Sequence, residues 1–196
     1  MVLSAVGWRA ATLAWLDELV VGKSLCPWAS PAIAADGFRL LAVRDVALLE
    51  SAIVEEARLL EASTTVRPTT LIVVDADVEP PAAFGQIATL AQARLASTDI
   101  DLLAFHPSRL DTGPGCVADP EDAAHFSVRS PLPTLQLLKR SDLASTRDEW
   151  KAVHNSPLPG ALGLLHENKR KLRRIGSTAL RSSLEKWREH WNKATL

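Results

Sequence analysis

The sequence predicts an α/β protein: a sandwich with a small mixed sheet of about four strands, helices packed on it and a C-terminal helical extension. Four short segments rich in branched apolar residues predict the strands, and segments with apolar residues every three or four positions alternate with them. Hydrophobic residues make up 47% of the 196-residue chain, which is enough for one buried core. No apolar run reaches the roughly 20 residues of a membrane span, so a soluble protein is expected.

The N-terminal half is expected to begin with a helix over residues 3–22, in which apolar residues recur at helical spacing and Ser4 is available as a cap. Prolines at positions 27 and 31 lack an amide hydrogen, so residues 23–31 are expected to form a fixed loop. The next predicted elements are a strand at Phe38–Val43, a helix from Asp45 to about Ala62, a strand at Thr69–Val74, a helix from Pro80 or Pro81 to about Leu95, and a strand at Asp101–Phe105.

Residues 106–132 interrupt this alternation with a long loop rich in proline and glycine. Loops of that length in compact domains are usually functional or disordered, so the loop is a place to expect a site. The elements expected after it are a strand at Pro133–Lys139, a helix from Ser141 or Asp142 through Trp150, a polar connector over residues 155–160, and a helical C-terminal segment.

The last segment carries a narrow apolar seam on an otherwise charged helix, formed by Leu180, Leu184, Trp187 and Trp191. We therefore expect one α/β domain over residues 1–176 and an amphipathic helix over residues 177–196. The seam is expected to dock on its own domain. The alternative is docking on a partner chain, which would make the protein a homo-oligomer.

Charge is unevenly distributed along the chain, whose formal net charge is -1. Residues 166–196 carry nine Lys or Arg and three Glu, while the rest of the chain is acidic. Because no aromatic or glycine-rich element is interleaved with the basic run Lys169–Arg174, a solvated helix face is expected there rather than a nucleic-acid site. The two cysteines, Cys26 and Cys116, are too far apart in sequence for a small disulfide scaffold, which indicates reduced thiols and a cytoplasmic location.

Three segments have the composition of a functional site: residues 22–29 (GKSLCPWA), a segment from Phe105-His106-Pro107 to Gly113, and a segment that begins Arg129-Ser130-Pro131. With His166-Glu167-Asn168-Lys169 they follow the order of a known pattern: G-L-N-L-C-P-F-A, F-H-P-x-Y-x-F-x-G, N-R-S-P-Y-P with L-H-L-L-R, and P-E-R-N. The chain therefore resembles the DUF1415 family, a domain of unknown function, over roughly residues 8–176. The resemblance implies a shared fold and a map of the site, but no reaction.

Several polar and aromatic residues of the family pattern are replaced in this chain. Gln136 stands where the pattern has the His of L-H-L-L-R, and Leu132 where it has the Tyr of the proline-rich motif. Arg109 and Asp111 replace a Tyr and a Phe, and Val128 replaces an Asn. If the family is enzymatic, these changes predict altered specificity or loss of activity in this member.

The retained residues suggest a thiol-dependent enzyme of acyl-transfer or hydrolase type that acts on a small anionic substrate. Cys26 is the candidate nucleophile and His106 the candidate base, because an imidazole can both lower the pKa of a nearby thiol and carry the proton in acyl transfer. Arg129 offers a planar fork for a carboxylate or phosphate. The expected substrate-binding residues are Arg129, Ser130, Asp122 and Gly113.

Each candidate also has a purely structural interpretation. A buried Cys26 would behave as a small apolar residue, His106 would hydrogen-bond a loop carbonyl, and Arg129 would pair with an acid such as Asp122. The alternative function is a non-catalytic ligand-binding or partner-binding protein with a degenerate site. No cofactor or metal is expected, because the sequence has neither a nucleotide-binding glycine motif nor the close ligand pairs of a zinc site.

Overall fold

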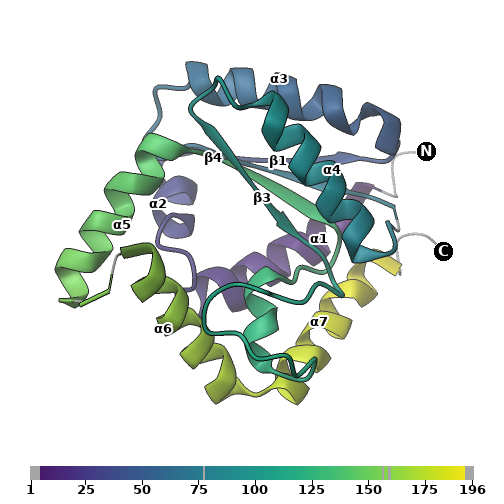
Figure 1. Cartoon of the computed structure of the whole chain (residues 1–196). Coiled ribbons are helices and arrows are strands. Elements are labelled where there is room, and N and C mark those ends of the chain that lie inside the picture. Colours follow the sequence, from purple (N-terminus) through teal and green to yellow (C-terminus); the bar gives the residue numbers. More distant parts are fainter. Residues whose placement is uncertain (1–4, 77, 156, 159, 193–196) are drawn as a thin grey trace.

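A computed structural model describes residues 5–76, 78–155, 157–158 and 160–192 of the chain. Its strands are β1 (Phe38–Val43), β2 (Thr69–Val74), β3 (Ile100–Phe105) and β4 (Thr134–Lys139). They form one open sheet in the order β1-β2-β4-β3 (Figure 1). β1 is parallel to β2, while β4 is antiparallel to both of its neighbours. The predicted α/β fold with a small mixed sheet is therefore confirmed.

Helical segments precede, connect and follow the strands. Those before β2 are α1 (Ala5–Trp15), the π-helical η1 (Leu16–Val21), α2 (Ala29–Ala34), the 3-10 helix η2 (Val46–Leu48) and α3 (Leu49–Ala62). Those after β2 are α4 (Pro81–Arg94), the 3-10 helix η3 (Ala123–Val128), α5 (Arg140–His154), α6 (Gly160–Ile175) and α7 (Ser177–Asn192). Within the described ranges, none of these helices combines the length and the apolar character that crossing a membrane requires.

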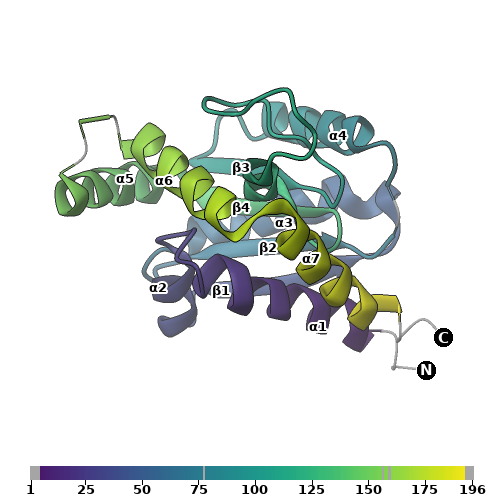
Figure 2. The same ribbon diagram turned by 90° about the horizontal axis from the view of Figure 1, so that it is seen from below.

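Helices cover both faces of the sheet, so all six residues of β2 are buried, and its last four, Leu71–Val74, form an apolar run. Ile72 and Val74 pack into one core with residues of α3 and α4. Leu71, on the opposite face, packs into a second core with residues of α1, η1, α6 and α7, and Val73 contacts α1 residues there. Figure 2 shows α6 and α7 crossing this second face together with α1.

The apolar seam of α7 is buried against the protein's own α1 and the sheet. Leu180, Leu184 and Trp187 belong to the second core, and only 1% of Trp187 is exposed. The indole Nε1 of Trp187 donates a hydrogen bond to Glu18, at 3.0 Å from Oε2. The indole of Trp191 donates to Asp75 on the loop after β2. The described part of the predicted helix over residues 177–196 thus packs within the chain, and residues 193–196 lie outside the described ranges.

Some predicted boundaries are corrected by the structure. The expected helix over residues 3–22 is divided into α1 and η1, and its predicted start at Leu3 and cap Ser4 lie outside the described residues. The expected loop over residues 23–31 ends early, because α2 begins at Ala29. Pro31 lies in the first turn of α2, where a missing amide hydrogen breaks no helical hydrogen bond.

Two further corrections concern the second half of the chain. The long loop over residues 106–132 contains η3, whose cap is Asp122: its carboxylate accepts a hydrogen bond from the Ala124 N–H at 3.0 Å. α5 continues past Trp150 to His154, and residues 156 and 159 of the expected connector lie outside the described ranges. α6 and α7 are separated at Gly176, whose φ of 89° lies in the left-handed region that favours glycine.

Candidate functional site

A cavity of about 280 Å³ lies on the second face of the sheet, beside the loop that carries Cys26. Mostly apolar concavities of a few hundred Å³ with a few polar groups are typical of small-molecule sites. The apolar walls come from both ends of the chain and from the sheet between them: Trp15, Leu16, Leu19, Leu25, Trp28, Phe38, Leu71, Phe105, Phe126, Leu138, Leu143 and Leu164.

The segments that resemble the family pattern converge on this cavity. The loop of residues 25–29 forms one wall and is fixed to α6, because the side-chain amide of Asn168 donates a hydrogen bond to the Leu25 carbonyl at 2.6 Å. Gln136 enters the lining from β4 and donates to the hydroxyl of Thr69 at 3.1 Å. Residues far apart in sequence are thus brought to one site by the packing of α6 on the sheet.

Three buried polar atoms of the lining have no hydrogen-bond partner within the described part of the protein: Trp15 Nε1, Trp28 Nε1 and Asn168 Oδ1. Trp15 and Trp28 are only 4% and 5% exposed. Because buried polar groups are nearly always paired, and an unpaired one costs about 1–3 kcal/mol, such a cluster needs an explanation. These atoms have almost no accessible surface, so a ligand in the cavity could bond to them only if a neighbouring side chain moved.

Arg147 of α5 is the charged residue of the described lining. It is partly buried, and within the described ranges no carboxylate forms an ion pair with it. An arginine at the edge of an apolar cavity binds a carboxylate or phosphate through a planar pair of N–H donors. The cavity therefore combines an apolar body with one positive group.

Cys26 lines the cavity and packs beside Trp28, Leu138 and Leu143. Burial raises the pKa of the Cys26 thiol above its ordinary value, although hydrogen bonds from the backbone N–H groups of Trp28 and Ala29 oppose this effect. A thiol with a raised pKa is protonated at neutral pH and is a poor nucleophile. The local environment therefore favours a wall residue over an activated nucleophile.

His106 lies on the opposite face of the sheet, so the structure does not form the expected pair of Cys26 and His106. Phe105 packs against Trp15 on the cavity face, and His106, the next residue, packs against Phe84 of α4 on the other. Both ring nitrogens of His106 are engaged there: Nδ1 accepts the Ser108 N–H at 3.2 Å, and Nε2 lies 2.8 Å from the Val78 carbonyl. The structural interpretation of this buried histidine, a bond to a loop carbonyl, fits its position.

Arg129 and Ser130 make contacts that hold the chain just before the start of β4. Arg129 Nε donates to the Arg109 carbonyl at 3.0 Å, and its guanidinium lies 4.7 Å from the centroid of the Phe126 ring. Burial lowers the pKa of Arg129, and the nearby Arg181 lowers it further. The hydroxyl of the fully buried Ser130 donates to the Leu132 carbonyl at 2.5 Å. These contacts organise the backbone, and neither residue lines the cavity among the described residues.

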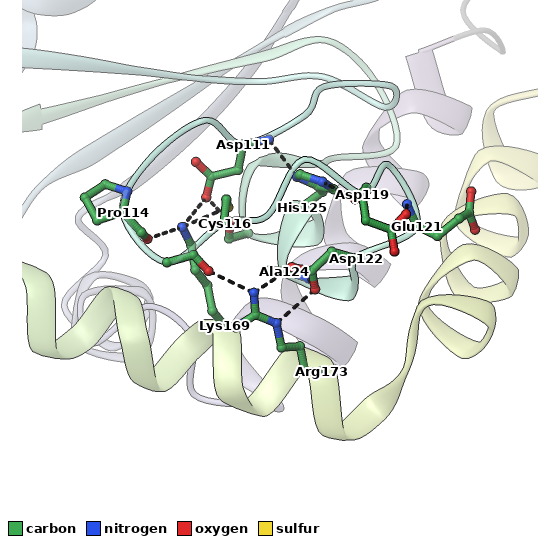
Figure 3. Close-up of polar contacts among 12 residues, drawn as sticks. Asp111, Pro114, Cys116, Asp119, Glu121, Asp122, Ala124, His125, Lys169 and Arg173 are labelled. Carbon is green, nitrogen blue, oxygen red and sulfur yellow. Dashed lines mark hydrogen bonds and ion pairs between the residues drawn. The ribbon is translucent and has the colours of Figure 1, made fainter.

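Asp122 belongs to a polar cluster that fastens the long loop to α6 (Figure 3), and the backbone of Gly113 contacts the same cluster. Asp122 forms an ion pair with Arg173, with 2.6 Å between Asp122 Oδ2 and Arg173 Nη2. The ion pair with Arg129 that the sequence suggested as an alternative is therefore not formed. The N–H of Gly113 donates to Asp111 at 2.8 Å. Of the six predicted site residues, all of which are described, Cys26 is the one that lines the cavity.

Lys169 is the buried centre of this cluster and was not predicted from the sequence. Its ammonium lies 2.9 Å from Asp111 Oδ2, with 1% of the lysine side chain and 10% of the aspartate side chain exposed. Burial raises the pKa of Asp111, but hydrogen bonds from Gly113, Lys169 and Ser127 outweigh it and lower that pKa to about 2. The ion pair therefore fixes the loop through a fully charged, buried contact.

The fold and this cavity define a mixed-sheet α/β protein with an apolar cavity between the sheet and its covering helices. The chain belongs to the family described as a protein of unknown function (DUF1415), whose model matches residues 8–181. The family expected from the sequence motifs is thereby confirmed, and the match extends into the first residues of α7.

Neither a curated protein nor a solved structure was found to match the chain. Among the described residues, no group of three or more His, Cys, Asp or Glu side chains is arranged to hold a metal ion.

Proposed function

We propose that the protein binds a small amphipathic molecule in the cavity beside Cys26, with its apolar body against the sheet and its anionic head at Arg147. This is the ligand-binding alternative of the sequence analysis, with a different anchor for the anion. The observation that carries it is the apolar cavity of about 280 Å³, in whose described lining Arg147 is the one charged side chain.

The chemistry of the ligand follows from the lining. The large apolar wall favours a hydrocarbon or aromatic body, because burial of apolar surface contributes roughly 25 cal/mol per Å². A carboxylate or phosphate head is the natural partner of the Arg147 guanidinium, which is partly buried in the lining.

Binding is favoured over thiol-dependent catalysis by the groups that surround Cys26. Acyl transfer by a cysteine requires a base that removes the thiol proton. The titratable groups of the described lining are the Cys26 thiol and the Arg147 guanidinium, and burial raises the pKa of the thiol. His106 uses its ring nitrogens on the other face of the sheet.

The test is a calorimetric titration with octanoate and with octanol, which share an apolar chain and differ in the charge of the head. We expect octanoate to bind the wild-type protein more tightly than octanol. The variant Arg147→Gln should weaken octanoate binding by roughly tenfold, which corresponds to about 1.4 kcal/mol, and should leave octanol binding unchanged.

Arg9→Gln is the matched control, because Arg9 is an exposed arginine on α1 that does not line the cavity among the described residues. It should bind both probes like the wild type. The proposal is contradicted if neither probe binds, or if the losses of octanoate affinity in Arg147→Gln and Arg9→Gln are equal.

A further inference from the structure

The side chain of Lys169 extends from α6 into the long loop and contacts the thiol of Cys116 (Figure 3). The distance from Lys169 Nζ to Cys116 Sγ is 3.0 Å, and the same nitrogen donates to the Pro114 carbonyl at 2.6 Å. Lys169 is 1% exposed, whereas Cys116 is partly exposed. The pair thus consists of a cysteine that is partly open to solvent and a buried lysine nitrogen held beside it.

The loop that carries Cys116 is fixed in this position by contacts independent of the cysteine. Arg173, one turn further along α6, donates to the Gly115 carbonyl at 2.8 Å and pairs with Asp122. Gly115 has a φ of 80°, which places the chain in the left-handed region next to Lys169. The bond from Arg173 and the turn at Gly115 thus hold the loop so that the Cys116 sulfur stays beside the Lys169 nitrogen. A bond between these two atoms requires such proximity.

We propose that Cys116 and Lys169 are a redox-modification site, at which a peroxide joins Sγ and Nζ through one bridging oxygen atom. The product is an N–O–S cross-link between the loop and α6. This site is separate from the cavity beside Cys26 and does not depend on the proposed function.

The reaction consumes two molecules of peroxide. In the first step, the thiol takes one oxygen from hydrogen peroxide to form a sulfenic acid, and one water leaves. In the second step, an N–O bond forms between the sulfenic oxygen and Nζ. The sulfenic O–H and one N–H lose their hydrogens to the second peroxide, which is reduced to two waters. One further proton of the original ammonium is released to the buffer, and the bridging nitrogen keeps one hydrogen.

The test is peptide mapping by mass spectrometry of the whole protein after treatment with hydrogen peroxide in mildly alkaline buffer, where a thiolate is available. We expect a linked pair of peptides, one with Cys116 and one with Lys169, that has gained one oxygen and lost two hydrogens. Dithiothreitol should separate the pair.

Two variants serve as controls for the pair. Cys116→Ser and Lys169→Arg should each give no linked peptides, and Lys169→Arg keeps the cation beside Asp111. The proposal is overturned if wild-type Cys116 is recovered as a free thiol or as sulfinic or sulfonic acid without a link. It is also overturned if the linked pair lacks the added oxygen, or if the link persists in Lys169→Arg.

Discussion

Replacement of Lys169 by methionine is expected to lower the free energy of unfolding by about 3–5 kcal/mol, because it leaves the carboxylate of Asp111 buried without its cation. The same change removes the bonds from Nζ to the Pro114 carbonyl and to Cys116. Urea unfolding at neutral pH measures the effect. Lys151→Met is the matched control: Lys151 is exposed on α5, and a change within about 0.5 kcal/mol is expected there.

The pH dependence of this loss gives the prediction a second readout. The pKa of Asp111 is lowered to about 2 in the folded protein, so the ion pair stabilises the protein above the ordinary carboxyl pKa, and the stabilisation is lost as the pH falls toward about 2. The difference in stability between the wild type and Lys169→Met should therefore shrink over this acid range. A difference that is small at neutral pH, or that does not change in acid, contradicts the role assigned to this ion pair.

Replacement of Trp187 by alanine is expected to destabilise the protein by about 3–5 kcal/mol, the usual cost of removing a buried aromatic side chain. The change removes the largest side chain that α7 contributes to the second core, and it removes the indole N–H that donates a hydrogen bond to Glu18. Thermal or urea unfolding measures the loss. Trp150→Ala is the control, because Trp150 is partly exposed on α5 and stacks on the exposed His154.

The mass of the protein in solution decides between the two expectations for the apolar seam. Because the seam packs within the chain, Trp187→Ala should reduce stability without changing the mass. An oligomer that dissociates in this variant while the monomer stays folded would contradict packing within the chain and would support docking on a partner.

The strands were predictable because their signal is local. Phe38–Val43 and Thr69–Val74 have the predicted boundaries, since branched apolar residues fill them and turn residues flank them. The start of α2 was not predicted, because proline is compatible both with a loop and with the first turn of a helix. Pro31 excludes a helix interior but is compatible with a first turn, and this is the position it has in α2.

The site was harder to predict because it depends on which face of the sheet each side chain occupies. The sequence places His106 directly after a strand, but only the packing of Phe84 and Trp15 shows that His106 and Phe105 point to opposite faces. Two of the lining polar residues, Gln136 and Asn168, lie in motifs that the sequence analysis singled out. Arg147 had no such signal, because its role follows from the position of α5 beside the cavity.

The ion-pair partners of the aspartates in the long loop could not be predicted from the sequence either. Asp122 pairs with Arg173 and Asp111 with Lys169, each more than fifty residues further along the chain. The basic run of α6 was expected to be a solvated face, yet its Lys169 is fully buried because the long loop folds over it. Charge patterning gives the composition of a helix face, but it does not identify the segment that covers it.

The most direct test of the proposed binding site is the rate of Cys26 alkylation by iodoacetamide as a function of pH, in a Cys116→Ser background, with and without octanoate. We expect the rate to rise only at pH values above the ordinary thiol range, because burial raises the pKa of Cys26, and we expect octanoate to slow the reaction by occupying the cavity. A reactive thiolate with an apparent pKa well below about 8.5, whose alkylation octanoate does not slow, would contradict the binding site and would support an activated nucleophile.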